Sequence, residues 1–312
     1  MRESALLEHI YRTAADSAAA SIPPGDDMGA MTVGGAQVLV TVDQLADQVH
    51  ADLQTMALDR VARKAVTRNL SDVAAMAARP SGAVVAATLP QDFGESRATH
   101  LFDAMKHVAE RFECPLIGGD IGLWPHALLL SVTVFAEPAG IEPVRRSGAR
   151  VGDAVYVSGA LGGSLETVDG YCHHLDFTPR INLARALAGQ SPTRPHAMID
   201  LSDGLGRDLT RLCQASGVSA TIDAERLPIS DAARQASEKT GLAPWRHAVA
   251  DGEDYELLFT APPGSIPRTC EGVELHQIGT LIEPADQPAA TLSFATGQTI
   301  DLAHAGWEHA SA

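Results

Sequence analysis

Helix-spaced apolar residues recur in both halves of the chain. Residues 3–15 show the spacing most simply, because Leu6, Leu7 and Ile10 share one face when this segment is drawn as a helix. Residues 56–76 have the length of a longer helix, and the small apolar side chains of its C-terminal half suit tight packing. Three more helices are expected at residues 96–112, with Ser96 as the N-cap, at residues 203–215 and at residues 231–239.

Shorter apolar runs, rich in β-branched residues, predict strands between these helices. They lie at residues 38–42, 84–89, 128–135, 154–158, 220–222 and 255–260. Because helices and strands mix in both halves, the expected fold class is α+β with a mixed α/β arrangement. Pro138, Gly140 and Pro143 interrupt the pattern and predict a linker. We therefore expect an N-terminal domain of residues 1–138 and a C-terminal α/β domain of residues 139–312.

The composition indicates an acidic globular protein. The 312 residues are 45% hydrophobic, and the mean hydropathy is near zero. The formal net charge of −16 argues against a nucleic-acid binder, which needs basic surface to meet phosphates, and against docking on anionic membranes. An acidic protein that handles anionic substrates must recruit metal ions or a few well-placed arginines.

The cysteines and the apolar runs bear on where the protein works. No two cysteines form a CxxC pair, which argues against a zinc site and against thioredoxin-like chemistry. The first 20 residues lack the unbroken apolar core of a signal peptide, and the most apolar stretch, residues 127–136, is too short to span a bilayer. A cytoplasmic location is therefore expected, with reduced thiols at Cys114, Cys172, Cys213 and Cys270.

Six short acidic motifs are spread along the chain, several of them at the end of an apolar run. They are Gly25-Asp26-Asp27, Thr41-Val42-Asp43, Asn69-Leu70-Ser71-Asp72, Gly118-Gly119-Asp120, Asp200-Leu201-Ser202-Asp203-Gly204 and Asp251-Gly252-Glu253-Asp254-Tyr255-Glu256. Carboxylates gathered at one site repel one another, so such a site needs cations, and hard oxygen ligands beside phosphates suit Mg²⁺. The first hypothesis is a Mg²⁺-dependent enzyme that acts on nucleotide phosphates.

Other phosphate-binding signatures fail on their spacing. The chain has no G-x-x-x-x-G-K-[ST] motif, which excludes a P-loop. The glycine-rich segment of residues 159–163 lacks the Rossmann spacing, so we interpret it as a turn that opens a helix, whose N-terminus still offers amides to a phosphate. Each acidic motif is also weak by itself, because Asp before Gly is usually a turn and Ser-Asp is often a helix cap.

Taken together and in this order, the six motifs resemble the thiamine-monophosphate kinase family. Its superfamily includes aminoimidazole ribonucleotide synthetase, selenophosphate synthetase and a hydrogenase maturation protein. The resemblance covers nearly the whole chain, since residues 41–50, residues 146–153 and Gly306-Trp307-Glu308-His309 also match. It implies the two-domain fold of aminoimidazole ribonucleotide synthetase and a homodimer, in which N-terminal strands of two subunits join into a barrel.

The resemblance also implies a role for each matched residue. The N-terminal domain would bind ATP and Mg²⁺ and form the dimer, and the C-terminal domain would complete the site. Mg²⁺ would be held by Asp27, Thr41, Val42 through its backbone, Asp43, Asp72, Asp120, Asp200 and Asp203. ATP would contact Gly119, Asp120, Arg146 and Ser202, and thiamine monophosphate would contact His50, Glu253 and Trp307.

The function implied is transfer of the ATP γ-phosphoryl group to thiamine monophosphate, which yields thiamine diphosphate. Such a transfer needs cations between two repelling phosphates rather than a covalent protein intermediate, and Arg146 supplies a fixed fork for a phosphate. Ile121 and Gly122 depart from the family, which usually has hydroxyl residues there. Two alternatives therefore stay open: another ATP-dependent enzyme of the superfamily with a different acceptor, and a nucleotide-binding regulator with weakened catalysis.

Overall fold

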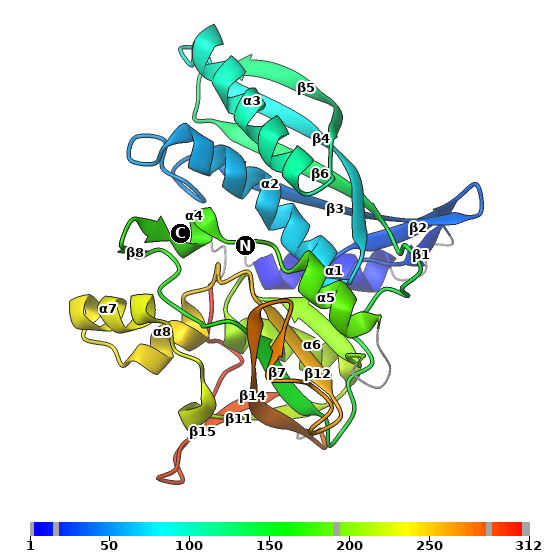
Figure 1. Cartoon of the computed structure of the whole chain (residues 1–312), viewed down its shortest axis with the longest axis vertical. Coiled ribbons are helices and arrows are strands. Elements are labelled where there is room, and N and C mark those ends of the chain that lie inside the picture. Colours follow the sequence, from blue (N-terminus) through cyan, green and yellow to red (C-terminus); the bar gives the residue numbers. More distant parts are fainter. Residues whose placement is uncertain (1–2, 15–18, 190–193, 285–288, 308–312) are drawn as a thin grey trace.

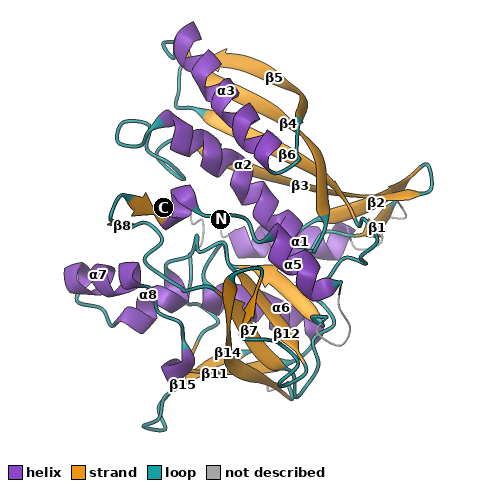
Figure 2. Ribbon diagram, in the orientation of Figure 1, coloured by secondary structure: helices purple, strands orange, loops and turns teal. Residues whose placement is uncertain are grey.

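Two large β-sheets, each covered by helices, form most of the computed structural model of the chain (Figure 1). The structure describes residues 3–14, 19–189, 194–284 and 289–307. The first half of the chain builds one sheet and the second half builds the other, which confirms the mixed α/β, two-domain expectation (Figure 2). None of the helices within these ranges has both the length and the apolar character needed to cross a membrane.

The first sheet has six strands in the order β1-β2-β3-β6-β4-β5, so β1 and β5 form its two edges. Only β4 and β5 pair in parallel, which is possible because α3 connects them. Helices α2 and α3 cover one face of this sheet (Figure 1). The elements of this half are α1 (Glu3–Ala14), β1 (Ala20–Ile22), β2 (Gly29–Val33), β3 (Ala36–Ala46), α2 (Leu58–Ala75), β4 (Arg79–Pro90), α3 (Glu95–Arg111), β5 (Leu116–Trp124) and β6 (Leu129–Glu137).

The second sheet has the order β10-β12-β7-β14-β11-β15-β16, and β13 pairs with β14 beside it. Its central strands β7 (Ala154–Ser158) and β12 (Leu257–Ala261) are buried along their whole length, as expected for strands covered on both faces. The other strands of this sheet are β10 (Ala197–Asp200), β11 (Ser219–Asp223), β13 (Thr269–Cys270), β14 (Val273–Ile282), β15 (Ala290–Ser293) and β16 (Thr299–Asp301). Strands β8 (Thr167–Val168) and β9 (Tyr171–Cys172) form a separate two-stranded sheet. The helices are α4 (His173–Asp176), α5 (Ile181–Ala188), α6 (Leu205–Ser216), the 3₁₀ turn Ala224–Arg226, α7 (Asp231–Thr240) and α8 (Pro244–Ala250).

Helix α2 joins the two halves into one core. It lies between the sheets in Figure 1, and its buried Val61, Val66 and Leu70 belong to a cluster that includes Phe259 of β12 as well as strands of the first sheet. A second cluster lies on the other face of the second sheet, under α6 and α8. The small residues in the C-terminal half of α2 allow this close packing on both sides, as the sequence predicts.

Two local predictions are wrong. Ser96 lies inside the first turn of α3, and Gly94 is the N-cap. The Gly118-Gly119-Asp120 motif, where no strand was expected, lies within β5, because these residues pair in register with β4. Glycine is required there, since a Cβ at Gly119 would lie 2.1 Å from the Val85 carbonyl oxygen.

The segment 159–163 also differs from its prediction, because no helix begins there. The Gly162 amide donates a 2.7 Å hydrogen bond to Asp254, and the Gly163 amide donates a 2.9 Å bond to Asp251. These amides are therefore occupied by carboxylates of the sixth acidic motif. The segment fixes that motif in place rather than offering a phosphate site.

Candidate functional site

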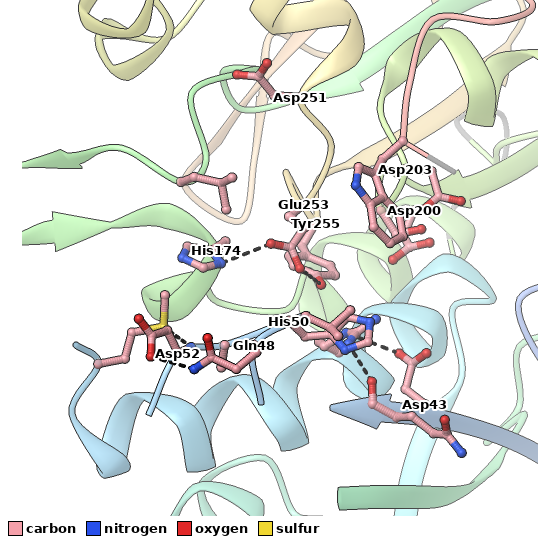
Figure 3. Close-up of a pocket in the computed structure, with 18 of the residues that line it drawn as sticks. Asp43, Gln48, His50, Asp52, His174, Asp200, Asp203, Asp251, Glu253 and Tyr255 are labelled. Carbon is pink, nitrogen blue, oxygen red and sulfur yellow. Dashed lines mark hydrogen bonds and ion pairs between the residues drawn. The ribbon is translucent and has the colours of Figure 1, made fainter. Parts of the chain in front are cut away.

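A cavity of about 750 Å³ lies between the two domains (Figure 3). Its N-terminal wall is the turn after β3, from Gln48 to Asp52, together with the face of α2 that carries Arg68 and Asp72. Its C-terminal wall comes from the loops around Ser202 and Glu253, with Trp307 beside them. Four of the six acidic motifs thus meet at one cavity, although their sequence positions are far apart.

Three carboxylates form a compact cluster at one end of this cavity. Asp27, Asp72 and Asp200 each offer an oxygen, and these oxygens lie within 4.8 Å of one another. Asp72 comes from α2 and Asp200 from the end of β10, so the cluster joins both domains. Asp27 and Asp200 are buried, and Asp72 is half-buried. Hard, closely spaced oxygens of this kind fit Mg²⁺.

Neighbouring hydroxyls orient the carboxylates of this cluster. Thr41 on β3 donates a hydrogen bond to Asp72 Oδ2, and Ser71 donates to Asp200 Oδ2 at 2.7 Å. Thr41 therefore reaches the cluster through Asp72. Ser71, a neighbour of Asp72 in the third motif, is a supporting residue that sequence reasoning did not single out.

The surroundings of the cluster raise the pKa of two of its carboxyl groups. Burial, and then the charges of Asp43 and Asp200, raise the pKa of Asp72 well above the ordinary aspartate value. Burial and then Asp27 raise the pKa of Asp200 in the same direction. Both shifts follow from placing like charges together out of water, and a bound divalent cation would reverse them.

These shifts predict how the stability of the metal-free protein depends on pH. A carboxyl group whose pKa is higher in the folded than in the unfolded state binds more protons when folded, so stability falls as the pH rises between the two values. In EDTA we expect a lower melting temperature at pH 7.5 than at pH 5.5. At pH 7.5, saturating Mg²⁺ should raise the melting temperature by roughly 5–10 °C, and by less at pH 5.5.

The measurement is differential scanning fluorimetry of the wild type beside two variants. Asp72→Asn should lose most of the Mg²⁺ response because an amide is a poor Mg²⁺ ligand. Asp59→Asn, on an exposed turn of the same helix, should keep it. The metal assignment would be rejected by a wild type that does not respond to Mg²⁺ at pH 7.5.

Arg146 lies against this cluster. Its guanidinium contacts Asp27 at 2.8 Å, and its backbone amide donates to Asp26 at 2.7 Å. Burial alone would lower the pKa of Arg146, but Asp27 raises it above the ordinary arginine value. Arg146 thus keeps its charge beside the carboxylates, where it can neutralise Asp27 or turn to a phosphate.

Two further predicted residues lie in the loop that follows Asp200 of the cluster. Ser202 and Asp203 both line it, and Asp203 pairs with Arg211 at 2.6 Å. The Trp307 amide donates to the Asp203 carbonyl at 2.9 Å, which brings the end of the described chain to this loop. Gly306 permits the approach, since a Cβ there would lie 2.5 Å from the same carbonyl. Glu308 and His309, which also matched the motif, lie outside the described residues.

His50 and Glu253 face the cavity from opposite walls, as Figure 3 shows. The His50 ring is oriented by the Ala46 amide, which donates to Nδ1 at 3.1 Å. Glu253 contacts the buried Lys64 at 2.7 Å and His174 at 3.0 Å. Burial opposes its charge, but His174 and Lys64 more than compensate and lower the pKa of Glu253 to about 2. The carboxylate therefore stays ionised at neutral pH.

Two protein-family models match this chain. The model of the AIR synthase related protein N-terminal domain matches residues 25–137, and the model of the C-terminal domain matches residues 173–287. A thiamine-monophosphate kinase of Rhodopirellula baltica is 37% identical over 243 residues, covering 77% of this chain and 74% of that protein. One from Aquifex aeolicus is 32% identical over 284 residues, covering 83% and 90%. This chain belongs to the thiamine-monophosphate kinase family.

A solved structure extends the likeness to three dimensions. The structure of AaThiL complexed with AMPPCP and TMP matches with a TM-score of 0.83 at 30% sequence identity. The match covers 99% of this chain and 97% of that chain. Both domains of the thiamine-monophosphate kinase fold are therefore present in this chain.

One motif that supports membership of the thiamine-monophosphate kinase family lies away from the cavity. Asp120 on β5 shares a row of the sheet with Gln44, whereas Asp43 shares its row with Gly119. Asp120 therefore occupies the sheet face opposite to Asp43. Three strand spacings, or about 14 Å, separate β5 from β3. Within one chain, Asp120 does not join the carboxylate cluster.

The remaining predicted positions lie on β3. Asp43 lines the cavity, and its amide donates a hydrogen bond to the Asn69 side-chain oxygen at 3.0 Å. The Val42 side chain is 59% exposed on the opposite face, so any part it has in the site comes through its backbone. Neither Val42 nor Ile121 lines the cavity. Ile121 lies on a different strand, the edge strand β5, where its side chain is exposed.

Sequence reasoning missed two basic residues of this thiamine-monophosphate kinase family site. Lys64 and Arg68 precede Asp72 on α2 at intervals of four residues, a spacing that places all three on one helical face. Arg68 donates to the Gln44 carbonyl at 2.7 Å and lies 3.8 Å from Asp43. The i, i+4, i+8 spacing of two cations and a carboxylate was the available signal.

Proposed function

We propose that this chain is the ATP-dependent phosphotransferase that converts thiamine monophosphate to thiamine diphosphate. The observation that carries this function is the cavity, which combines a carboxylate cluster with exposed apolar and aromatic side chains. Its relatives named thiamine-monophosphate kinase, and AaThiL complexed with AMPPCP and TMP, support the same reaction and both substrates. AMPPCP is an ATP analogue, so ATP is the phosphoryl donor.

The carboxylate cluster is proposed as the Mg²⁺ site. Asp27, Asp72 and Asp200 would supply direct ligands, and we assign Asp43 and Asp203, which line the same cavity, as further ligands. Bound Mg²⁺ would neutralise the charge that develops between the donor and acceptor phosphates. Arg146 and Ser202 lie beside this end of the cavity, and we assign them to the triphosphate.

The rest of the cavity is proposed as the acceptor site. Val49, Leu165 and Trp307 line it while remaining 56%, 62% and 45% exposed, so they present apolar surface toward the opening. A flat heteroaromatic group would cover this surface. Glu253 is ionised there and suits the positive ring of thiamine, and His50 on the facing wall suits its phosphate. His50, Glu253 and Trp307 are thus assigned to the acceptor.

The proposed active form is a homodimer in which two first sheets join into a barrel. The edge strand β5 supports this, because Ile117, Ile121 and Leu123 on it are more than 60% exposed. Gly119 and Asp120 would then reach nucleotide or metal in a partner subunit rather than in their own. The domain division at residues 138 and 139 is supported by the family match that ends at residue 137. The four unpaired cysteines support a cytoplasmic location.

The test is a discontinuous assay of purified protein with ATP, Mg²⁺ and thiamine monophosphate. We expect equimolar ADP and thiamine diphosphate, separated by chromatography, and no product in EDTA. Thiamine and aminoimidazole ribonucleotide serve as control acceptors. Turnover with another acceptor alone would point to a different enzyme of the superfamily, and nucleotide binding without turnover would point to a regulator.

A further inference from the structure

A buried lysine links the two walls of the acceptor site. Lys64 on α2 has no exposed surface, which is unusual for an ammonium group. Its Nζ lies 2.6 Å from the His50 carbonyl oxygen, 2.8 Å from His174 Nδ1 and 2.7 Å from Glu253 Oε1. An ammonium has three donors, and the His50 carbonyl oxygen and the two Glu253 oxygens, the second at 2.9 Å, accept all three, which leaves His174 Nδ1 to donate to Glu253.

The partners of Lys64 belong to different parts of the molecule. His50 lies in the turn after β3, which is the N-terminal wall of the cavity. Glu253 lies in the loop between α8 and β12, which is the C-terminal wall, and His174 lies on α4. One buried ammonium therefore connects the backbone of one wall to a carboxylate of the other. Figure 3 shows His174 and Glu253 directed toward each other on this side of the cavity.

The loop that carries Glu253 needs such an anchor. Glu253 has φ +55° and Tyr255 has φ +48°, a left-handed conformation that is unfavourable for a residue other than glycine. The Glu253 amide donates to the Ser202 carbonyl at 2.7 Å, and the Tyr255 amide donates to the Leu201 carbonyl at 2.8 Å. These bonds hold the backbone, and Lys64 and His174 hold the Glu253 side chain.

We propose that Lys64 is a positioning residue for the acceptor, because it sets the separation between the His50 turn and the Glu253 loop. This inference rests on the proposed function in so far as the acceptor is thiamine monophosphate. Lys64 does not line the cavity itself, so it acts through its partners rather than by contact with substrate. If Lys64 merely joined the two domains, its removal would lower the stability of the fold without selectively raising the KM for the acceptor.

Arg63 provides a matched control on the same helix. Its guanidinium donates to the backbone carbonyls of Asp176 at 3.1 Å and Phe177 at 2.5 Å. It therefore ties α2 to the C-terminal half as Lys64 does, but it reaches no residue of either cavity wall. Arg63→Met and Lys64→Met each remove one cation and one link between the halves. They differ in the segment that is released, which is the end of α4 for Arg63 and the two cavity walls for Lys64.

Steady-state kinetics of these variants separate positioning from general stability. In Lys64→Met we expect the KM for thiamine monophosphate to rise roughly tenfold or more, with the KM for ATP within about twofold of wild type. Arg63→Met should leave both KM values within about twofold, even though it is less stable. Equal rises of the acceptor KM in both variants, or an unchanged acceptor KM in Lys64→Met, would overturn the proposal.

Hydrogen–deuterium exchange without substrate tests the same geometry independently of the reaction. Amides at residues 46–53 and 251–256 should exchange faster together in Lys64→Met and not in Arg63→Met. If the wild type fails to phosphorylate thiamine monophosphate but this pattern appears, the proposed function is wrong and the bridge is retained. Unchanged exchange in both segments rejects the bridge.

Lys64→Arg keeps the test decisive if Lys64→Met does not fold. The larger guanidinium keeps the charge but cannot occupy the same fully enclosed position, so the two walls must move apart. The acceptor KM should rise while the KM for ATP stays near the wild-type value. A wild-type acceptor KM in folded Lys64→Arg would reject the positioning role.

Discussion

Asp72→Asn should lower phosphoryl transfer by about 10²–10³-fold while the protein stays folded. Asp72 is the member of the carboxylate cluster that α2 contributes, and its oxygen lies within 4.8 Å of those of Asp27 and Asp200. An amide keeps the shape and still accepts the hydrogen bond from Thr41, but it removes the negative charge that a divalent cation requires. The loss should therefore appear mainly in turnover.

The measurement is kcat for thiamine diphosphate formation at saturating ATP and several Mg²⁺ concentrations. Asp59→Asn is the control, since it removes a carboxylate from the same helix at an exposed position. In the absence of metal, Asp72→Asn should melt about 2–4 °C above the wild type, because a repulsion on the order of 1 kcal/mol is relieved. Near-normal turnover at low Mg²⁺ would remove Asp72 from the metal site.

Ile121→Lys should convert the proposed dimer to a monomer and reduce turnover by about 10²-fold or more. Ile121 is 62% exposed on the edge strand β5, and a lysine there would place a charge where two strands are expected to pair. Turnover should fall with the dimer, because Asp120 on the same strand is about 14 Å from β3 in its own chain and needs a partner to reach a site.

Light scattering reports the assembly, with a wild-type mass expected at twice the 32.7 kDa of one chain. Leu242→Lys is the control, because Leu242 is 49% exposed in the connection between α7 and α8, away from β5. It should leave both mass and turnover unchanged. A monomeric wild type with full activity would contradict the dimer and the assignment of Asp120 to a partner's site.

The five helices and six strands that were expected from local patterns all occur, whereas other elements, such as the ten-residue strand β14, were not expected. The longest helix was expected at residues 56–76 and occurs as α2, Leu58–Ala75, because its spacing and small side chains are local properties. Strand β7 was expected at residues 154–158 and lies there. Strand β5 was not expected, because the Gly118-Gly119-Asp120 motif forms part of a strand only through its pairing with the distant strand β4.

The candidate site was predictable in its chemistry but not in its geometry. Acidic motifs with glycine, serine and threonine beside them indicate a cation site whichever way the chain folds. That Asp27, Asp72 and Asp200 meet while Asp120 does not depends on strand register and on how α2 packs between two sheets. Lys64 was missed for a similar reason, since its partners His174 and Glu253 lie more than 100 residues further along the chain.

The sequence by itself determined the kind of chemistry, the family and the order of the elements, because these depend on residue types and short-range spacing. Only the tertiary structure decided which carboxylates share one cation site, which lysine joins the walls of the cavity, and which apolar edge is left exposed. These features are separations of a few ångströms between distant segments. They are set by non-local pairing and packing, in which a shift of one residue along a strand turns a side chain to the other face.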